Sequence, residues 1–359
     1  MRILRVAQNL YPEVPGGGTY HVHAMSRDQA AMGHDVTVLT IRHDENLPHV
    51  EKRHGYRVVR YDSLASPLGN DVAPGLARHL ASADRFDVIH AHSHYYFSTN
   101  LAALKRSVGN TPLAITNHGL YSQSAPERVF RWYLKTLGRW TFDQADVVFC
   151  YTETDRERVQ ELGVSSQIEV VPNGIDTDRF TPKGPESKFI DAEGPVVLFV
   201  GRFAEGKRPL LAVEAFAEVL EKYPEAELYL CGEGPLREDI AANMRERGVE
   251  SSVTFLGQVP YDDMPAVYRS ADALILPSRA EGVPRTVMEA LSSGLPVVSS
   301  ELPQIRSAFG DTVTYVPEED AFGERLADVL DGDRERSTLD EQFSWDRTVE
   351  ETTRALEEL

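Results

Sequence analysis

Short hydrophobic runs recur along the whole chain and alternate with longer segments in which hydrophobic residues have helical spacing. Several runs, such as VVLFV at 196–200, contain no alternating polar residues, as is typical of strands covered on both faces. Strands that alternate with helices predict parallel sheets with crossover helices. The expected strands are RILRVAQ, DVTVLT, YRVVRYD, DVIHA, PLAIT, DVVFCY and IEVVP in the first half, and PVVLFVG, AELYLCG, VTFLG, ALILPS and PVVSS in the second.

The chain is long enough for two domains, because 359 residues exceed what one simple core accommodates. Residues 179–194 have no periodicity and form the expected linker. We therefore expect an α/β protein with a doubly wound, Rossmann-like domain at 1–178 and a second one at 195–343. The tail at 344–359 reads as an amphipathic helix that packs back on the first domain through Val349, Ala355 and Leu356. Ligands of open parallel sheets bind beyond the carboxyl ends of the strands, so the two domains are expected to face one interdomain cleft.

The charge balance restricts the classes of partner. The chain has 56 acidic and 37 basic residues, a formal net charge of −19, and its basic residues are 30 arginines and 7 lysines. This acid-rich, lysine-poor composition favours a salt-adapted source and argues against a nucleic-acid partner. At molar salt the screening length falls to about 3 Å, so a few local cations can still hold an anionic ligand.

Cysteine usage and the N-terminus indicate an intracellular protein. Cys150 and Cys231 each end an expected strand and read as core thiols. The N-terminus MRILRVAQN reads as a strand, and no hydrophobic run approaches the roughly 20 residues that span a bilayer. We expect a cytoplasmic location.

The segment EGVPRTVMEALSSGLPVV at 281–298 sets Glu281 and Glu289 around a helix that Pro284 opens at its first position. Free backbone N–H groups at such a helix start attract anions. Carboxylates repel phosphate. Glu281 and Glu289 therefore fit beside an anion-binding helix start if they accept hydrogen bonds from the hydroxyls of a sugar and a ribose. The structural alternative is that Glu281 caps a turn and Glu289 pairs with Arg285 at i,i+4 spacing.

Positive charge is available in VGRFAEGKRP, where Arg202 and Lys207 follow an expected strand. Arginine binds phosphate bidentately and lysine acts as a point charge, although both could be ordinary solvent-facing cations. At the other end of the chain, the glycine-rich loop in YPEVPGGGTY is a second candidate phosphate site.

The motifs together resemble retaining glycosyltransferase family 4, nucleotide-sugar enzymes of the GT-B fold. The second half resembles it in GRFAEGKRP, CGEGPL, FLGQVP and LPSRAEGVPRTVMEALSSGLPVV, and VVPNGID precedes these. The first half resembles it in GGGTYHVHAMSRDQAAMGHDVTVLT, DVIHAHS and TNHG. The resemblance covers nearly the whole chain and implies an acceptor-side N-terminal domain and a nucleotide-sugar-binding C-terminal domain.

The resemblance implies a role for each matched residue. Glu281 would face the donor-sugar hydroxyls, and Glu289 would hydrogen-bond the ribose. Arg202 and Lys207 would bind the diphosphate and stabilise the leaving group, while His118 would lie against the transferred sugar near the reacting carbon. The backbone near the diphosphate would come from Gly17, Gly18, Gly282, Val283 and Pro284.

The implied reaction transfers a hexose-type sugar from a UDP or GDP donor to a glycan or lipid-linked acceptor, with retention and without a metal or other cofactor. Alternatives are a sugar-nucleotide epimerase of similar architecture and a non-catalytic nucleotide-sugar-binding protein. A dinucleotide-dependent oxidoreductase is disfavoured because VPGGGTY lacks the G-x-G-x-x-G spacing. The chain departs from many family members at Val283 and Pro284, where they have Phe-Gly, and at Tyr20, where they have Glu.

Two patterns could be mistaken for metal sites. HAHSH would place His90, His92 and His94 on one face if extended, as zinc ligands can be, but the first two match the family's own strand end. DTD at 176–178 has Asp-x-Asp spacing but follows a Pro-Asn-Gly turn. We expect no metal at either.

The segment ERVFRWYLKTLGRWTF at 127–142 is basic in an otherwise acidic chain. One hypothesis is an amphipathic helix that rests on anionic lipid at the inner face of the cell membrane and brings a lipid-linked acceptor to the enzyme. The alternative is an ordinary packed helix with its aromatic residues inward. The candidate membrane contacts are Arg128, Arg131, Trp132, Lys135 and Arg139.

Overall fold

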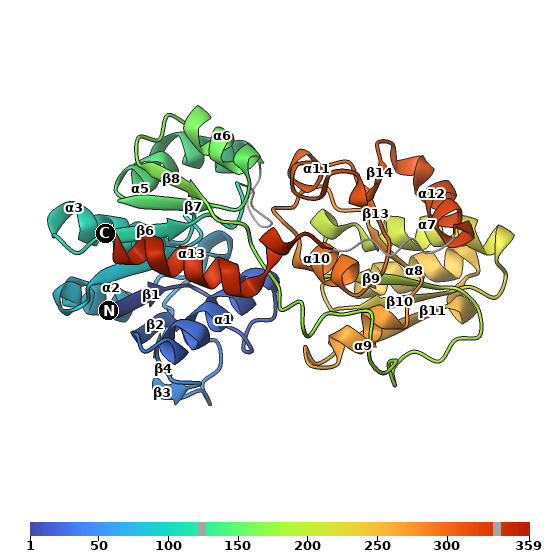
Figure 1. Ribbon diagram of the computed structural model, residues 1–359, viewed down its shortest axis with the longest axis horizontal. Coiled ribbons are helices and arrows are strands. Elements are labelled where there is room, and N and C mark those ends of the chain that lie inside the picture. Colours follow the sequence, from blue (N-terminus) through green and yellow to red (C-terminus); the bar gives the residue numbers. More distant parts are fainter. Residues whose placement is uncertain (121–126, 333–338) are drawn as a thin grey trace. The chain divides into compact units, whose positions relative to one another are not determined.

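A computed structural model describes residues 1–120, 127–332 and 339–359 and divides the chain into two compact units (Figure 1). Unit 1 comprises Met1–Pro172 and Asp346–Leu359, and unit 2 comprises Asn173–Trp345. Each is an α/β domain built on a largely parallel sheet, as the sequence predicts. The expected interdomain cleft stays a prediction.

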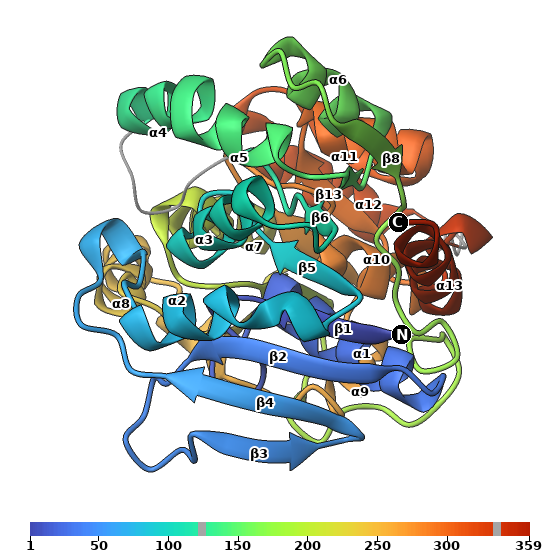
Figure 2. The same cartoon turned by 90° about the vertical axis from the view of Figure 1, so that its left-hand side faces the viewer.

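Within the described residues, unit 1 has an eight-stranded sheet with the order β3-β4-β2-β1-β5-β6-β7-β8 (Figure 2). All its strand pairs are parallel except β3 with β4. The sequence did not predict β3, whose polar residues carry little hydrophobic signal. The strands are β1 (Arg2–Val6), β2 (Asp35–Ile41), β3 (Val50–Arg53), β4 (Tyr56–Tyr61), β5 (Val88–His92), β6 (Leu113–Thr116), β7 (Val147–Cys150) and β8 (Gln167–Val170).

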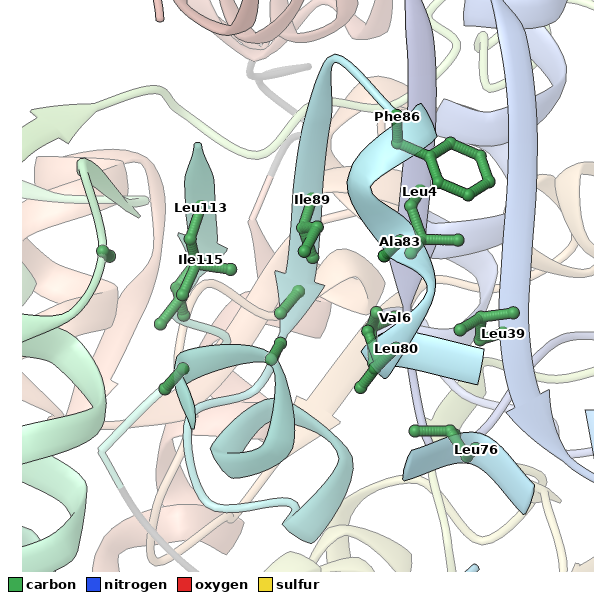
Figure 3. Close-up of a cluster of buried hydrophobic side chains, with 14 of the residues drawn as sticks. Leu4, Val6, Leu39, Leu76, Leu80, Ala83, Phe86, Ile89, Leu113 and Ile115 are labelled. Carbon is green, nitrogen blue, oxygen red and sulfur yellow. The ribbon is translucent and has the colours of Figure 1, made fainter. Parts of the chain in front are cut away.

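Helices cover both faces of this sheet. Successive strand residues point to opposite faces, so Leu4 packs in a cluster with Leu76 and Leu80 of α2 (Figure 3). Ile3 packs in another cluster with Leu356 of α13. The helices are α1 (Gly17–Ala31), α2 (Pro74–Ala81), α3 (Phe97–Val108), α4 (Glu127–Tyr133), α5 (Arg139–Asp143), α6 (Glu153–Glu161) and α13 (Trp345–Glu357), with a π-helical turn at Leu134–Gly138 and 3-10 turns at Pro67–Gly69 and Ala83–Arg85.

Unit 2 has a six-stranded parallel sheet with the order β11-β10-β9-β12-β13-β14 in its described part. This is the order of a Rossmann fold, in which the chain reverses direction between the first strand and the fourth. The strands are β9 (Val196–Val200), β10 (Glu227–Cys231), β11 (Val253–Gly257), β12 (Ala273–Leu276), β13 (Val297–Ser300) and β14 (Thr314–Val316). The sequence did not predict β14, which is three residues long.

The helices of unit 2 alternate with its strands. A hydrophobic cluster joins the sheet to α7 through Ala212, Val213 and Phe216, all fully buried. The helices are α7 (Pro209–Lys222), α8 (Arg237–Arg247), α9 (Met264–Arg269), α10 (Arg285–Ser292), α11 (Pro303–Phe309) and α12 (Phe322–Asp331), with 3-10 turns at Glu205–Lys207, Glu250–Ser252, Gly310–Thr312, Glu319–Ala321 and Glu341–Phe343.

The boundary between the units differs from the sequence prediction. Unit 1 ends at Pro172 and not at residue 178, and the expected linker at 179–194 belongs to unit 2. Phe180 is fully buried there, and Arg269 donates hydrogen bonds to the carbonyls of Thr181 and Pro185. A non-periodic segment can thus be fixed by hydrogen bonds from a distant side chain to its carbonyls, which the sequence does not display.

The C-terminal helix α13 lies with unit 1. Ala355 and Leu356 pack in the cluster that contains Ile3, and Gln29 of α1 donates a hydrogen bond to Thr353 at 2.9 Å. Val349 is also buried. Cys150 and Cys231 are buried free thiols, and burial raises their pKa values to about 12 and about 11. Among the described helices, none is both long and apolar enough to span a membrane.

Candidate functional site

In unit 2, the loop that follows β9 meets the loop that follows β12. Lys207 Nζ donates a hydrogen bond to Glu281 Oε1 at 2.5 Å. The Glu281 side chain is only 4% exposed and that of Lys207 is 20% exposed, so the ion pair is mostly shielded from water. Lys207 and Glu281 lie 74 positions apart in two different sequence motifs, and in the structure they form one charged pair.

Backbone contacts at two loops fix this pair. Arg279 N donates to Gly206 O at 2.9 Å, which ties the residues just before Glu281 to the residue just before Lys207. The loop after β10 packs equally closely, because a Cβ on Gly232 would lie 1.9 Å from Gly201 O. Gly232 also has φ +147°, so both its space and its backbone conformation require glycine. This explains the first glycine of CGEGPL.

Arg202 lies in the same loop, five residues before Lys207, and is exposed. Within residues 1–120, 127–332 and 339–359, its guanidinium makes no ion pair or side-chain hydrogen bond. It is therefore an uncommitted cation at the carboxyl end of β9.

The helix start predicted at Pro284 is displaced by one residue. Helix α10 begins at Arg285, and Pro284 is its N-cap with φ −72° and ψ 122°. The reason is that the Pro284 carbonyl accepts the amide of Val287, which makes Pro284 the half-helical flanking residue. Gly282, Val283 and Pro284 are buried, and Glu281 precedes them directly.

Glu289 lies in the buried face of α10 and accepts two tyrosine hydroxyls. Tyr261 donates to its Oε1 at 2.8 Å, and Tyr268 donates to its Oε2 at 2.9 Å. Burial raises the pKa of Glu289, and the charge of Arg285 opposes this effect. A carboxylate has about four lone-pair positions, so these two bonds leave capacity for further hydroxyl donors.

The structural alternative for Glu289 is also present. Arg285 Nε lies 3.6 Å from Glu289 Oε1, one turn along the helix. Arg285 is buried, donates to Gly174 O and to Tyr261 Oη at 2.9 Å each, and lies over the Trp345 ring. It thereby links α10 to the segments at both ends of unit 2.

In unit 1, Gly18 lies against His118. A Cβ on Gly18 would be 3.6 Å from His118 Nδ1. The sequence predicted a loop for Gly17 and Gly18. In the structure they form the first turn of α1 instead, with Gly16 as N-cap. Thr19 donates its hydroxyl to Val14 O and Gly16 O, which holds the chain at the helix start.

Both ring nitrogens of His118 have partners. The Tyr151 hydroxyl lies 2.8 Å from its Nδ1, and His92 Nδ1 lies 3.0 Å from its Nε2. Burial lowers the pKa of His118 to about 4. The imidazole is therefore neutral at pH 7 and held in one plane by a partner on each side.

His118, His92 and His90 form a row of neighbouring imidazoles, and a buried arginine, Arg5, contacts His90. Arg5 is fully buried and bonds Ser26 at 2.8 Å, Gln29 at 2.6 Å and His90 Nδ1 at 3.3 Å. Because arginine only donates, His90 Nδ1 accepts, and its Nε2 donates to Thr116 Oγ1 at 2.7 Å. Burial lowers the pKa values of His90 and His92 well below normal, and the Arg5 charge lowers them further.

The described residues contain no group of three or more His, Cys, Asp or Glu side chains that could hold a metal ion. In HAHSH, the rings of His90 and His92 lie 4.5 Å apart, whereas His94 turns to Phe142 at 4.6 Å. In DTD, Asp176 accepts the backbone amide of Arg179 at 3.0 Å and so forms a turn.

The basic segment at 127–142 has a mixed outer surface. Phe130 and Leu134 are buried, as the packed-helix alternative predicts, but Trp132 is 70%, Val129 47% and Leu137 44% exposed. The four cations Arg128, Arg131, Lys135 and Arg139 are exposed beside them.

The sequence patterns do not single out Tyr261, Tyr268, Tyr151 or Arg5. Each acts through a partner at least 21 positions away, and a tyrosine in a helix or at a strand end reads as an ordinary core residue. FLGQVP at 255–260 was part of the resemblance, but Tyr261 is the residue that follows it.

Two sequence families match the chain. The family described as Glycosyltransferase Family 4 matches residues 15–179, and that described as Glycosyl transferases group 1 matches residues 181–343. D-inositol 3-phosphate glycosyltransferase of Corynebacterium aurimucosum is 32% identical over 72% of this chain and 69% of the relative. An uncharacterized glycosyltransferase of Methanocaldococcus jannaschii is 26% identical over 98% of this chain and 97% of the relative.

Solved structures show the same fold. Sucrose-phosphate synthase from Thermosynechococcus elongatus has a TM-score of 0.82 at 21% identity, with coverage of 99% of this chain and 98% of that chain. HepE of Anabaena in complex with UDP-glucose has a TM-score of 0.82 at 18% identity, with full coverage of both chains.

Proposed function

Because the chain belongs to the group 1 glycosyltransferases and has the GT-B fold, we propose that it transfers a hexose-type sugar from a UDP-sugar with retention of the anomeric configuration. The observation that supports this best is the Lys207–Glu281 pair, held at 2.5 Å in unit 2. One site there offers a cation for a phosphate and a carboxylate for a hydroxyl. Structures of HepE in complex with UDP or UDP-glucose make UDP-sugars the first donors to test.

When the proposed donor binds, its groups replace the contact between Lys207 and Glu281. A phosphate oxygen takes the Lys207 ammonium, and a sugar hydroxyl donates to the Glu281 carboxylate, so each charge keeps a partner. Arg202 adds a guanidinium with no other commitment among the described residues. Charged hydrogen bonds of this kind are worth about 1.5–3 kcal/mol each.

Catalysis in this proposal is mainly electrostatic. Negative charge develops on the nucleotide diphosphate as the glycosidic bond breaks, and Lys207, Arg202 and the first amides of α10 stabilise it. These groups are proposed to act without a metal ion. Retention follows if the acceptor hydroxyl attacks from the face that the leaving group occupies.

The neutral imidazole of His118 is the proposed contribution of unit 1. With its pKa about 4, it is uncharged at neutral pH, and because both ring nitrogens already have partners it is proposed to contact the sugar through its ring and not as a charged acid. The Glu289 carboxylate is proposed to accept the ribose hydroxyls, with Tyr261 and Tyr268 holding it in place.

A lipid-linked acceptor is favoured by the exposed surface of the basic segment. Trp132 and Val129 expose apolar area next to four exposed cations, in a chain of net charge −19. Apolar side chains flanked by cations fit an anionic membrane surface. We therefore propose peripheral membrane contact through this segment of unit 1.

Turnover of a panel of UDP- and GDP-sugars with EDTA present, at low and molar KCl, tests the proposal. A transferase releases free UDP, an epimerase changes the sugar and leaves the nucleotide sugar intact, and a binding protein does neither. NMR of the product anomer tests retention. Absence of nucleotide release from every donor with lipid-linked and glycan acceptors would contradict the proposal.

A further inference from the structure

The carboxylate of Glu281 has one hydrogen-bond partner in the described part of the chain. Lys207 Nζ donates to its Oε1 at 2.5 Å, and no other described group bonds it. Only 4% of the Glu281 side chain is exposed, so water replaces a lost partner poorly. A buried charge that loses its partner is destabilising. A ligand that takes Lys207 must therefore satisfy Glu281 or leave it at a cost.

The main chain on both sides of Glu281 is fixed. Arg279 N donates to Gly206 O at 2.9 Å, which ties the residues before Glu281 to the loop that carries Lys207. The three residues that follow, at 282–284, are buried. The carboxylate therefore stays beside the ammonium group when a ligand binds there.

A phosphate that binds Lys207 comes close to Glu281. Hydrogen bonds from an ammonium to an anionic oxygen are about 2.7–2.9 Å long, so a phosphate oxygen on Lys207 Nζ lies within about 5.5 Å of Glu281 Oε1. Like charges at this separation repel more strongly in a shielded site than in water. The repulsion therefore depends on how much charge the phosphate carries.

A UDP-sugar and free UDP differ at this phosphate. In the UDP-sugar the phosphate is esterified, carries one negative charge and brings sugar hydroxyls. In the proposed reaction the bond from the anomeric carbon to the phosphate oxygen breaks, and its electron pair stays on that oxygen. The acceptor oxygen bonds the anomeric carbon and gives its proton to water. The terminal phosphate of UDP then approaches two negative charges at pH 7, and the sugar hydroxyls leave with the product.

We propose that Glu281 makes the donor site discriminate between substrate and product, holding the UDP-sugar and favouring the release of UDP. This inference rests on the proposed transferase function. While the glycosidic bond breaks, the sugar hydroxyls still donate to the carboxylate. Once the sugar has left, Glu281 faces a more highly charged phosphate and has no hydroxyl donor. A role limited to positioning Lys207 would instead favour UDP and the UDP-sugar equally.

Isothermal titration of the full chain with UDP and UDP-glucose in EDTA tests the proposal. Glu281→Gln keeps the shape of the side chain and removes its charge. It should bind UDP about tenfold more tightly and UDP-glucose about tenfold more weakly, and the inhibition constant of UDP should fall with its dissociation constant. Glu214→Gln is the matched control, because Glu214 forms an ion pair with Arg247 at 3.1 Å elsewhere in unit 2, and should change neither ligand.

The β-methyl ester of UDP separates charge from hydroxyl contacts, because it carries the charge of a UDP-sugar without the sugar. Glu281→Gln should tighten the ester less than it tightens UDP. The wild type provides a test that needs no variant: UDP should bind it no more tightly than the ester does, although UDP brings an extra negative charge to a cationic loop.

The direction of the two shifts decides the outcome. Equal weakening of UDP and UDP-glucose in Glu281→Gln would show that Glu281 only positions Lys207 and would overturn the proposal. The same shifts in Glu214→Gln, or wild-type binding of UDP that is tighter than that of the ester, would also overturn it. If the wild type binds UDP-glucose and releases UDP from it while these results are found, the proposed function stands and only this inference fails. If the wild type neither binds nor turns over UDP-glucose, both fail.

Discussion

The Tyr151 hydroxyl lies 2.8 Å from Nδ1 of His118, and His92 Nδ1 lies 3.0 Å from the opposite ring nitrogen. His118 stands at the end of a parallel strand, where a free side chain would rotate. Two fixed partners restrict it to one plane, with Gly18 of α1 packed against the ring.

Tyr151→Phe should lower kcat roughly threefold to tenfold and leave the donor KM nearly unchanged, because it removes a positioning hydrogen bond worth about 0.5–1.5 kcal/mol. Steady-state kinetics with a UDP-sugar measure both constants. Tyr56→Phe is the matched control, since Tyr56 bonds His23 Nδ1 at the same 2.8 Å elsewhere in unit 1. Equal losses in the two variants would show a general stability effect and contradict a positioning role.

The pKa of His118 predicts how the stability of unit 1 depends on pH. Its folded value is about 4 and its ordinary value is 6.5, so below pH 6.5 the unfolded chain binds a proton that the folded chain does not. Stability therefore falls as the pH drops from 6.5 towards 4. His118→Gln should reduce the slope of the unfolding free energy with pH by up to about 1.4 kcal/mol per pH unit, which corresponds to one proton bound on unfolding.

Urea unfolding followed by tryptophan fluorescence measures this slope, because Trp132 and Trp140 both lie in unit 1. The wild-type slope should exceed one proton, since burial also lowers the pKa values of His90, His92 and His94. An unchanged slope in the variant would mean that His118 is protonated in the folded protein.

Tyr268→Phe should destabilise unit 2 by about 1–3 kcal/mol at neutral pH, because it leaves a buried carboxylate oxygen of Glu289 without its donor. The folded pKa of Glu289 lies above its ordinary 4.5, so the cost of ionisation vanishes as the pH falls through the folded pKa. The deficit of the variant should therefore be smaller at an acidic pH below the folded pKa than at pH 7.

Thermal unfolding at both pH values checks this prediction. Tyr229→Phe is the control, because Tyr229 donates to the less buried carboxylate of Glu227 at 2.8 Å and should cost less. A deficit that grows as the pH falls would contradict the assigned role of Tyr268.

Membrane contact predicts cosedimentation with anionic vesicles that depends on the basic segment. Replacing Arg131, Lys135 and Arg139 by Glu should lower the partition coefficient at least 100-fold, since each cation near an anionic surface contributes about 1 kcal/mol. The control replaces Arg237, Arg245 and Arg247 of α8 by Glu, with the same change of charge. Equal loss in both triple variants, or binding to neutral vesicles alone, would exclude the segment as the contact.

The sequence predicted the parts of the fold that repeat locally. Hydrophobic runs marked the buried strands because both of their faces are covered, as VVLFV of β9 shows. The polar edge strand β3 lacked that signal, and β14 was too short to show one. The segment at 179–194 read as a linker because the long-range contacts of Phe180 and Arg269 leave no periodic pattern.

The sequence predicted those residues of the candidate site that lie in recognisable motifs, but not the contacts that they make. Motif spacing singled out Lys207 and Glu281, but not that the two side chains form an ion pair. The partners of Glu289 and His118 come from segments 21 to 33 residues away, and a lone tyrosine does not differ in sequence from a core residue. The helix start moved from Pro284 to Arg285 because one backbone hydrogen bond decides it.

The central claim is that the cationic loop after β9 binds a nucleotide diphosphate without a metal ion. Isothermal titration of UDP in the presence of EDTA tests it most directly, with Lys207→Ala compared with Lys222→Ala, an exposed lysine of α7 in the same unit. We predict that UDP binds the wild type in EDTA, that Lys207→Ala weakens binding roughly 10- to 150-fold, and that Lys222→Ala leaves it unchanged. UDP binding that requires added Mg²⁺, or that is equal in all three proteins, would contradict the account.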